Sequence, residues 1–146
     1  MELSESIRTV LKNKYFGFAG RASRSEYWWF QFLLFLINIG LGLLVIILVA
    51  LEANIDGFGL LMLPVAICMV ALLIPTLAVS ARRFHDINMS AGWLVVFLIL
   101  TAIPYVGFLT AIVWIVLFCQ RGTVGENRFG SDPLDNSMKT PVAQRV

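Results

Sequence analysis

The segment GFAGRASRSEYWWFQFLLFLIN, from Gly17 to Asn38, changes character at its middle. Its first half contains two arginines and a glutamate, and a Tyr-Trp-Trp cluster then leads into an apolar run. No Asp, Glu, Lys or Arg occurs between Tyr27 and Leu51. Such a run is longer than the roughly 20 apolar residues that a helix needs to cross a hydrocarbon core. The segment therefore predicts a membrane-spanning helix that begins beside a small basic patch.

Two further runs in the chain have the same character, and the composition agrees with them. The chain of 146 residues is 59% hydrophobic and only 14% charged, which separates it from soluble globular domains. The runs are continuously apolar rather than alternating, so we expect α-helices and not a β-barrel. We predict an all-α fold, a polytopic helical membrane bundle that forms a single membrane domain over residues 1–130. Its hydrophobic segments are expected at residues 27–51, 57–81 and 91–119.

The third hydrophobic segment, residues 91–119, allows two interpretations. A straight helix of this length would measure about 40 Å, which exceeds a typical hydrocarbon core of about 30 Å, and Pro104 lies near its middle. The segment is either one span kinked at Pro104 or a short hairpin whose second arm returns to the first side. Arg121 and Arg128 behind the segment favour the hairpin, whereas the shortness of the two arms favours the single kinked span.

The two ends of the chain differ from this apolar middle. Apolar residues recur at helical spacing over residues 3–18, with charged residues between them. This pattern predicts an amphipathic helix that lies in the headgroup region or packs on the bundle. Residues 131–146 are polar, contain proline and show no periodicity, which predicts a flexible polar tail.

The distribution of basic residues predicts the orientation in the membrane. Lys and Arg are frequent before the first hydrophobic segment and recur in the pair Arg82-Arg83, whereas the loop from Glu52 to Asp56 contains only acidic charges. Because basic loops stay in the cytoplasm, we expect the N-terminus and Arg82-Arg83 inside and the acidic loop outside. The protein is then a multi-pass membrane protein with a cytoplasmic N-terminus.

Polar residues next to the hydrophobic segments form the candidate functional face, and a cytoplasmic tail would bring all of them to one side. One interpretation is that the arginines bind an anionic lipid headgroup or another phosphate, because guanidinium groups match phosphate geometry. The other is a structural charged network in which the arginines set the topology and pair with Glu26 and Asp86. The candidate residues are Arg21, Arg24, Glu26, Arg82, Arg83, His85, Asp86, Asn127 and Arg128.

The remaining features argue against several classes of site. His85 is the only histidine, and without a second histidine or a nearby cysteine we expect neither a metal site nor a catalytic one. No nucleotide-binding loop or nucleophile elbow occurs, so we expect no enzymatic activity, no cofactor and no nucleic-acid partner. Aromatic residues at the segment ends fit an interfacial belt. These interface anchors are Tyr27, Trp28, Trp29 and Trp93.

Four separated motifs make the sequence similar to a known family. They are FGFAGRASRSEYWWF, RRFHDINMSAGW, IPYVG and QRGTVGENRFGSDP, in this order within residues 16–133. In these motifs the chain resembles the DUF805 family of small bacterial inner-membrane proteins. The resemblance implies a protein of the bacterial cytoplasmic membrane with a few helices, and it implies no reaction. The matching positions are Gly20, Arg21, Arg24, Glu26, Tyr27, Trp28, Arg82, Arg83, His85, Asp86, Trp93, Gly122, Gly125, Asn127 and Gly130.

The chain departs mildly from that pattern after the His-Asp pair. Where the family often has Gly and then Ser-Gly-Trp-Trp, this chain has Asn88 and the residues Ala-Gly-Trp-Leu at 91–94. In the last motif, Gly122, Gly125 and Gly130 can supply turns with positive φ, and Asn127 can supply a side chain that closes a loop.

The function predicted from these observations is a membrane scaffold or interaction protein, or a protein that binds anionic lipid headgroups. Its partners would be membrane lipids, a second copy of the chain or another membrane protein. A small transporter or channel subunit is the alternative. It is weakened because no Asp, Glu, Lys, Arg or His lies within the three hydrophobic segments. A membrane enzyme comes last, because it would rest on His85, Asp86 and the neighbouring arginines alone.

Overall fold

The computed structural model describes residues 2–50 and 55–135, and its regular elements in these ranges are all helical. This confirms the all-α class. The elements are α1 (Leu3–Arg8), a π-helical turn η1 (Thr9–Asn13), α2 (Arg24–Ala50), α3 (Ile55–Asp86), α4 (Gly92–Thr101) and α5 (Val106–Cys119). The acidic loop expected at Glu52–Asp56 lies mostly outside the described residues, and so does the part of the expected tail at 136–146.

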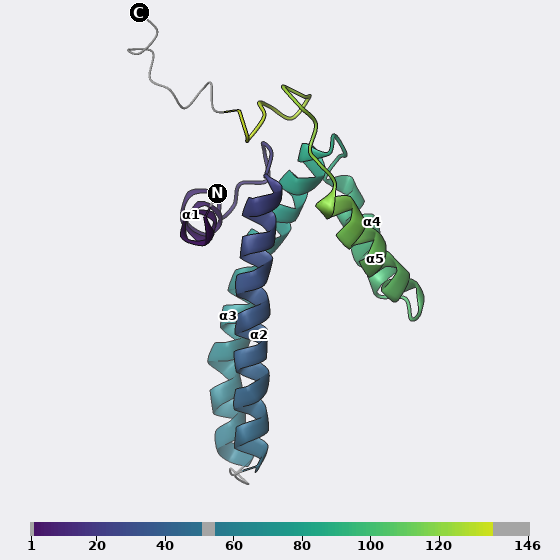
Figure 1. The fold of residues 1–146 in the computed structure, drawn as a ribbon. Helices are drawn as coiled ribbons and strands as arrows, with labels where there is room; N and C mark the ends of the chain where they lie inside the picture. Colours follow the sequence, from purple (N-terminus) through teal and green to yellow (C-terminus); the bar gives the residue numbers. More distant parts are fainter. Residues whose placement is uncertain (1, 51–54, 136–146) are drawn as a thin grey trace, which may run out of the picture.

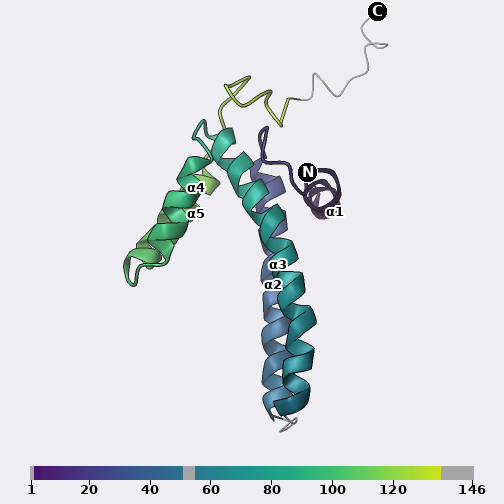
Figure 2. The ribbon, with the colours of Figure 1, turned by 180° about the vertical axis from the view of Figure 1, so that it is seen from behind.

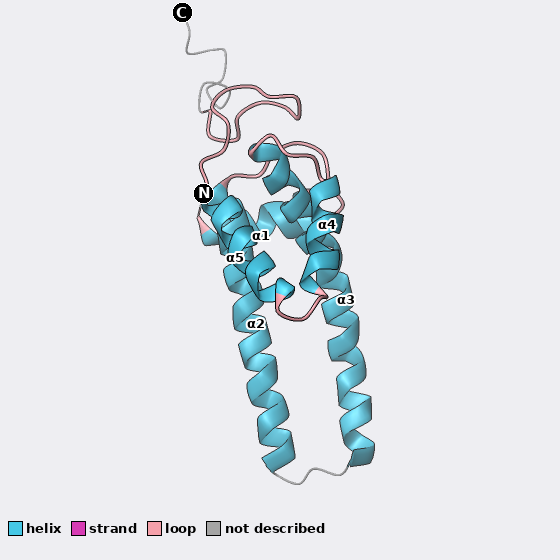
Figure 3. Cartoon of the chain, turned by 90° about the vertical axis from the view of Figure 1, so that its right-hand side faces the viewer, coloured by secondary structure: helices cyan, strands magenta, loops and turns pink. Residues whose placement is uncertain are grey.

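The helices form two antiparallel hairpins that share one end of the molecule (Figure 1). α2 and α3 make the long hairpin, and α4 and α5 make a shorter one that diverges from it (Figure 2). The short hairpin ends well before the far end of the long one (Figure 3). The chain after α5 returns over the shared end, where α2 begins and α3 ends (Figure 1). The polar motifs therefore gather at one end of the fold.

The third hydrophobic segment is the short hairpin and not a single kinked span. It contains α4 of 10 residues and α5 of 14 residues, each shorter than the roughly 20 residues of a full span. The described ranges thus contain two long apolar helices, with spans within Arg24–Ile47 and Met62–Asp86, rather than three. The chain reverses at residues 102–105, where Pro104 removes a helical N–H and Tyr105 adopts a φ of 64°.

The N-terminal amphipathic helix, expected over residues 3–18, is shorter. It ends at Asn13 after the π-helical turn, and α1 lies across the start of α2 (Figure 1). Ser6 is buried there and donates its hydroxyl hydrogen to the carbonyl oxygen of Glu26 at 2.7 Å. Val10 is also buried and belongs to the core. The apolar face of this helix thus packs on the bundle.

The start of α2 is set by a capping interaction. Ser23 precedes the helix, and its hydroxyl oxygen accepts a hydrogen bond from the backbone N–H of Glu26 at 3.2 Å. This Ser-x-x-Glu pattern is typical of a helix N-terminus. α2 therefore begins at Arg24, slightly before the segment expected at residues 27–51.

The end of α3 is set by Asn88, whose φ of 60° lies in the left-handed region. The backbone N–H of Asn88 donates to the carbonyl oxygen of His85 at 3.0 Å, and that of Met89 donates to the carbonyl oxygen of Phe84 at 2.9 Å. This pair of bonds is the Schellman arrangement that ends many helices. α3 thus continues beyond the segment expected at residues 57–81 and includes the first five residues of the motif RRFHDINMSAGW, Arg82 to Asp86.

Pro75 lies inside α3 without leaving a backbone acceptor unpaired. Proline has no N–H, so the carbonyl group of Ala71, four residues earlier, loses its helical donor. Tyr15 replaces that donor, because its hydroxyl donates to the carbonyl oxygen of Ala71 at 2.5 Å. In lipid, such a carbonyl requires a donor from elsewhere in the protein. The segment after η1 is thereby bound to α3.

The core lies at the shared end and is aromatic. Phe84 of α3 packs against Phe118 of α5 with ring centroids 4.8 Å apart, and Tyr27 of α2 lies 4.6 Å from the ring of Phe118. Trp114 of α5 lies 5.5 Å from Phe84. Away from this core, exposed apolar side chains cover the hairpins, as at Phe108, which is 72% exposed. The core therefore fixes how the hairpins meet, and the outer surfaces are available to lipid.

Candidate functional site

Among the described residues, five charged side chains are buried where the two hairpins meet. They come from the segment before α2, from the first turn of α2 and from the last turns of α3, and no more than 4% of any of them is exposed. Buried charges in an apolar setting must be paired. We call this set the polar junction, and it consists of Arg21, Glu26, Arg82, Arg83 and Asp86.

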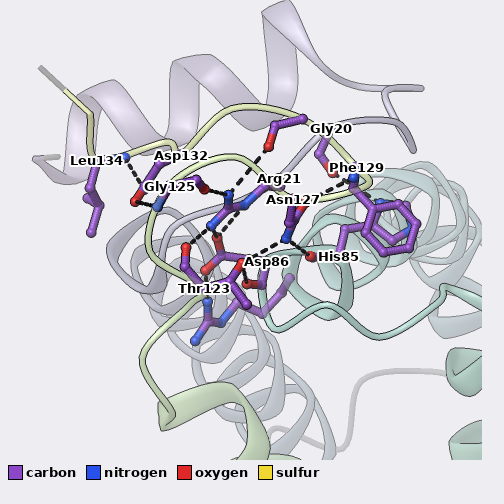
Figure 4. A network of polar contacts seen from close by, with 12 residues as sticks. Gly20, Arg21, His85, Asp86, Thr123, Gly125, Asn127, Phe129, Asp132 and Leu134 are labelled. Atoms are coloured by element: carbon purple, nitrogen blue, oxygen red, sulfur yellow. Dashed lines mark hydrogen bonds and ion pairs between the residues drawn. The ribbon is translucent and has the colours of Figure 1, made fainter. Parts of the chain in front are cut away.

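Asp86 lies at the centre of the polar junction (Figure 4). Its Oδ1 atom is 3.0 Å from Nε and 2.9 Å from Nη2 of Arg21. Its Oδ2 atom accepts a hydrogen bond from Nη1 of Arg83. Arg21 precedes α2 and the other two residues belong to α3, so charge-assisted hydrogen bonds connect the end of α3 to the segment before α2.

Glu26 and Arg82 form a second ion pair, between the start of α2 and the end of α3. Nη1 of Arg82 donates to Oε1 of Glu26, and the backbone N–H of Ala22 donates to the carbonyl oxygen of Arg82 at 3.1 Å. Nε and Nη2 of Arg82 are buried without a hydrogen-bond partner among the described residues. With three guanidinium groups and two carboxylates, the junction carries an excess of positive charge.

The arginines of the junction also bind the chain at and after the end of α5. Arg83 donates from Nε and Nη2 to the carbonyl oxygen of Phe118, at 3.1 and 3.0 Å. Arg21 donates to the carbonyl oxygens of Thr123 and, at 2.5 Å, of Gly125. The last carbonyl groups of a helix have no intrahelical donor, and cationic side chains are favourable there. The arginines of the junction therefore supply hydrogen-bond donors to a carbonyl group at the end of α5 and to carbonyl groups of the loop that follows it.

Gly122 is in close contact with Asp86. A Cβ atom at position 122 would overlap with the Asp86 carboxylate, so this position requires glycine for steric reasons. Thr123 donates from its backbone N–H and its hydroxyl to the carbonyl oxygen of Asp86, at 2.9 and 3.1 Å. Gly125 and Gly130 adopt positive φ, as the sequence predicted, whereas Gly122 does not. The loop after α5 is thus fitted directly against the junction.

His85 and Asp86 bind different partners. Nδ1 of His85 lies 3.0 Å from the carbonyl oxygen of Gly20, so this nitrogen is the donor. The imidazole ring stacks on Phe129 with ring centroids 3.9 Å apart. Asn127 donates from Nδ2 to the carbonyl oxygen of His85 at 3.0 Å (Figure 4). Asn127 and Phe129 therefore close the loop over the end of α3.

Two residues of the candidate face, Arg24 and Arg128, are exposed and lie outside the junction. Nη1 of Arg24 is 3.5 Å from the carbonyl oxygen of Cys119. Arg128 donates to the carbonyl oxygen of Asn88 at 3.0 Å, and its guanidinium carbon lies 4.7 Å from the ring centroid of Phe129. The remaining candidates lie in the junction or, like His85 and Asn127, in the loop contacts beside it.

The aromatic residues expected as interface anchors divide into two groups. Tyr27 is only 1% exposed and is therefore a core residue rather than a surface anchor. Its hydroxyl oxygen accepts a hydrogen bond from Nε1 of Trp114 at 2.9 Å. Trp28 packs partly against the core, while Trp29 and Trp93 are exposed. Consecutive residues on a helix point in different directions, so a Tyr-Trp-Trp run cannot face lipid with all three rings.

Sequence reasoning did not identify Trp114, Thr123 or Phe129 as contributors. Trp114 lies in a uniformly apolar segment, which contains no signal for the face that contacts Tyr27. Thr123 and Phe129 lie inside the last matched motif, and the motif itself was the available signal. Their roles depend on contacts that only the folded chain makes.

The chemistry available to the junction is the pairing of charge between helices. In the part of the chain that the structure describes, no group of three or more His, Cys, Asp and Glu side chains could hold a metal ion. Asp86 is paired with Arg21 and Arg83. Both partners are buried, so these contacts serve the fold directly.

Two apolar hairpins that meet at a buried polar junction define a small helical integral membrane protein. The chain belongs to the family described as Protein of unknown function (DUF805), which matches residues 15–131. All of the residues of the polar junction lie within this match.

Relatives of the chain occur in Escherichia coli (strain K12). The chain is 44% identical to Inner membrane protein YhaH over 124 residues, which cover 85% of this chain and 92% of the relative. It is 39% identical to Inner membrane protein YhaI over 126 residues, or 86% and 92% of the two chains. Uncharacterized protein YiiR is 30% identical over 145 aligned positions, which cover 85% of this chain and 90% of the relative. No solved structure matches the chain. These relatives support a bacterial inner-membrane protein.

Proposed function

We propose that this protein is a non-enzymatic membrane scaffold that presents the α4–α5 hairpin to another membrane protein or to a second copy of the chain. One observation carries this function: both carboxylates of the polar junction are paired with arginines of the same chain. Charged residues of the matched motifs that bind one another support a structural role. Their effect is to set the position of the short hairpin relative to the long one.

The outer surface of the short hairpin is the surface that a partner would contact. It is attached to the rest of the protein at the shared end, where Phe97, Trp114 and Phe118 pack against Phe84 of α3. Phe108 and Leu109 of α5 are exposed and apolar. Exposed apolar helices in a membrane pack either on lipid or on other helices. The hairpin is also too short to cross the membrane alone, which supports a partner beside it.

The orientation that fits this function places the shared end in the cytoplasm. Basic residues from four separate parts of the chain gather there, and basic segments favour the cytoplasmic side. These residues are Arg8, Lys12, Lys14, Arg21, Arg24, Arg82, Arg83, Arg121 and Arg128. The N-terminus and the chain after α5 are then both cytoplasmic.

A transporter or channel would need a polar path at membrane depth. Four polar side chains of the apolar helices are turned toward their own helices. Asn38, Thr76, Thr101 and Thr110 each donate a hydrogen bond to the carbonyl oxygen four residues earlier. Such bonds occupy donors that a polar path would require. This arrangement supports the scaffold over the transporter.

A membrane enzyme would need an activated side chain beside an open cleft. The imidazole of His85 is stacked on Phe129 and bound to Gly20. The carboxylate of Asp86 is shared between two arginines. These contacts support a structural role for the His-Asp pair.

Site-specific photocrosslinking in living cells tests the scaffold. A photoreactive amino acid is placed at Phe108, and at exposed Glu5 of α1 as the matched control. We expect a discrete protein crosslink from Phe108 and none from Glu5. The product should disappear in Asp86→Asn, which opens the junction, while the variant is still found in the membrane fraction. Lipid adducts alone at Phe108, or a protein crosslink that persists in Asp86→Asn, would contradict the scaffold function.

A further inference from the structure

At the start of α2, Arg24 lines a polar pocket beside the polar junction, and the next residue, Ser25, lines an apolar hollow. We propose that together they bind one membrane phospholipid whose headgroup contains both a phosphate and a primary ammonium group. Arg24 and Arg121 contact the phosphate, Asp132 contacts the ammonium group, and an acyl chain lies along α2 between Ser25 and Asn38. The scaffold function uses the outer face of α5, so lipid binding here and partner binding there can fail independently.

The polar pocket lies between the start of α2, the end of α3 and the loop that follows α5. Its volume is about 370 Å³, and charges of both signs line it. A wall of mixed charge suits a group that itself contains both charges, whereas a simple anion would be repelled by the carboxylates. The charged residues of the lining are Arg24, Arg121, Asp86, Asp132 and Asp135.

The two arginines of the pocket are able to bind a phosphate. Both are exposed, in contrast to the buried arginines of the polar junction. Arg24 makes one long contact, 3.5 Å from Nη1 to the carbonyl oxygen of Cys119. The side chain of Arg121 makes no hydrogen bond or ion pair with any residue that the structure describes. Guanidinium donors match the oxygens of a phosphate.

The carboxylates of the pocket differ in their partners. Asp86 is already neutralised by two arginines of the polar junction. Asp132 is bound instead by backbone groups: Oδ2 accepts from the N–H of Gly125 at 3.2 Å, and Oδ1 accepts from the N–H of Leu134 at 2.9 Å (Figure 4). Each carboxylate oxygen can accept a further hydrogen bond. A primary ammonium group provides three donors and a compensating charge for Asp132.

The apolar hollow begins with the residue after Arg24 and has a volume of about 770 Å³. One broad face of α2 lines it, from Ser25 past Phe32 and Phe35 to Asn38. At about 1.5 Å per residue this face is roughly 20 Å long, which is enough for one leaflet of a hydrocarbon core about 30 Å thick. An acyl chain in the hollow therefore places its headgroup at Arg24.

Native mass spectrometry of the purified full-length protein in detergent tests the site. The probes are phosphatidylethanolamine, phosphatidylcholine, whose nitrogen is fully methylated, and phosphatidylglycerol, which has no nitrogen. We expect one phosphatidylethanolamine per chain, bound about tenfold more tightly than either other lipid, the difference of roughly one charge-assisted hydrogen bond. Equal binding of the three lipids overturns the proposal. A preference for phosphatidylglycerol also overturns it, and indicates that the arginines alone bind an anionic headgroup.

Variants of the pocket test each contact separately. Arg24→Gln combined with Arg121→Gln should weaken phosphatidylethanolamine and phosphatidylcholine alike, because both contain the phosphate. Asp132→Asn should remove only the preference for phosphatidylethanolamine. Arg8→Gln, at an exposed arginine of α1, is the matched control and should bind like the wild type. If Arg8→Gln weakened phosphatidylethanolamine binding as much as the double variant, the proposal would be overturned. Thermal unfolding of each variant is measured as well, and an unchanged unfolding temperature excludes loss of the fold.

The position of the acyl chain has its own measurement. Phosphatidylethanolamine with brominated tails quenches the fluorescence of nearby tryptophans. The quenched fraction should fall when Trp28 and Trp29, which line the hollow, are both replaced by Phe. It should not fall in Trp93→Phe, at an exposed residue of α4. Equal quenching in all three proteins would place the lipid elsewhere and overturn the proposal.

Discussion

Tyr15 donates its hydroxyl hydrogen to the carbonyl oxygen of Ala71 at 2.5 Å. Ala71 is the residue whose helical donor is missing because Pro75 lies four residues later in α3. A side chain from outside the helix thus supplies the donor that Pro75 removes from a membrane span. The N-terminal segment is therefore a part of the membrane domain and not an appendage to it.

Replacing Tyr15 by Phe should lower the free energy of unfolding by about 1–3 kcal/mol, because the carbonyl of Ala71 loses its donor in an apolar setting. The measurement is SDS-induced unfolding of the purified protein. Tyr105→Phe, at a residue that is 93% exposed, is the matched control and should unfold like the wild type. Adding Pro75→Ala to Tyr15→Phe should recover part of the loss, since alanine restores the N–H. Unchanged stability of Tyr15→Phe would contradict the role of the bond.

Removing one member of the Arg82–Glu26 pair should be worse than removing both. Arg82→Met leaves the Glu26 carboxylate buried without its partner, and we expect a loss of about 3–5 kcal/mol. Arg82→Met combined with Glu26→Gln removes both charges and should recover a large part of that loss. The same unfolding assay compares them. If the single and double variants were equally unstable, the two side chains would not be coupled.

Gly122→Ala should disrupt the loop after α5, because the added methyl group overlaps with the Asp86 carboxylate. Limited proteolysis is the measurement, and we expect faster cleavage between α5 and residue 131. Gly42→Ala is the matched control, since nothing lies within 4 Å of a Cβ at that position. Alanine in the interior of α2 should stabilise the helix by up to about 1 kcal/mol. Equal cleavage of the two variants would mean that the close contact at Gly122 is unimportant.

The hydrogen bond between Tyr27 and Trp114 joins the two hairpins, so the two side chains should be energetically coupled. A double-mutant cycle with Tyr27→Phe and Trp114→Phe should show a coupling of about 0.5–1.5 kcal/mol. The control cycle pairs Tyr27→Phe with Trp93→Phe, whose exposed ring lies outside this contact, and should be additive. Additivity in both cycles would rule out the bond as a link between the hairpins.

The short hairpin places the end of α5 on the side where α2 begins, and the basic residues there favour the cytoplasm. A fluorescent protein fused after Val146 should therefore fluoresce, and an alkaline phosphatase fused at the same position should be inactive. The reverse pattern would mean that the segment of α4 and α5 crosses the membrane. It would also separate Asn127 from His85, contrary to their hydrogen bond.

The class of the fold and the place of its charges could be predicted from the sequence, because hydropathy and charge are properties of the chain itself. Arg21, Arg82 and Asp86 stand out at the edges of apolar runs for this reason. Which arginine binds which carboxylate could not be predicted. Asp86 binds Arg21 and Arg83 and leaves Arg82 to Glu26, and this choice depends on how α2 and α3 are rotated about their axes.

The chain reversal at residues 102–105 was open between two interpretations because residues 91–119 are apolar throughout. A uniform segment contains no periodicity that distinguishes a buried face from a lipid-facing one. For the same reason the burial of Tyr27 beside Trp114 was missed, and the adjacent rings were all assigned to the interface. The bond from Tyr15 to Ala71 joins distant parts of the chain, so only the tertiary fold determines it.

The polar junction has a consequence for the order in which the protein is made. Arg21 is synthesised early, whereas its partner Thr123 comes 102 residues later. At about 5–20 residues per second, the ribosome needs roughly 5–20 s to add that partner. During this interval α2 and α3 can enter the membrane, and Asp86 becomes available to Arg21 before Thr123 does. The loop after α5 is therefore the last of these segments that can join the polar junction.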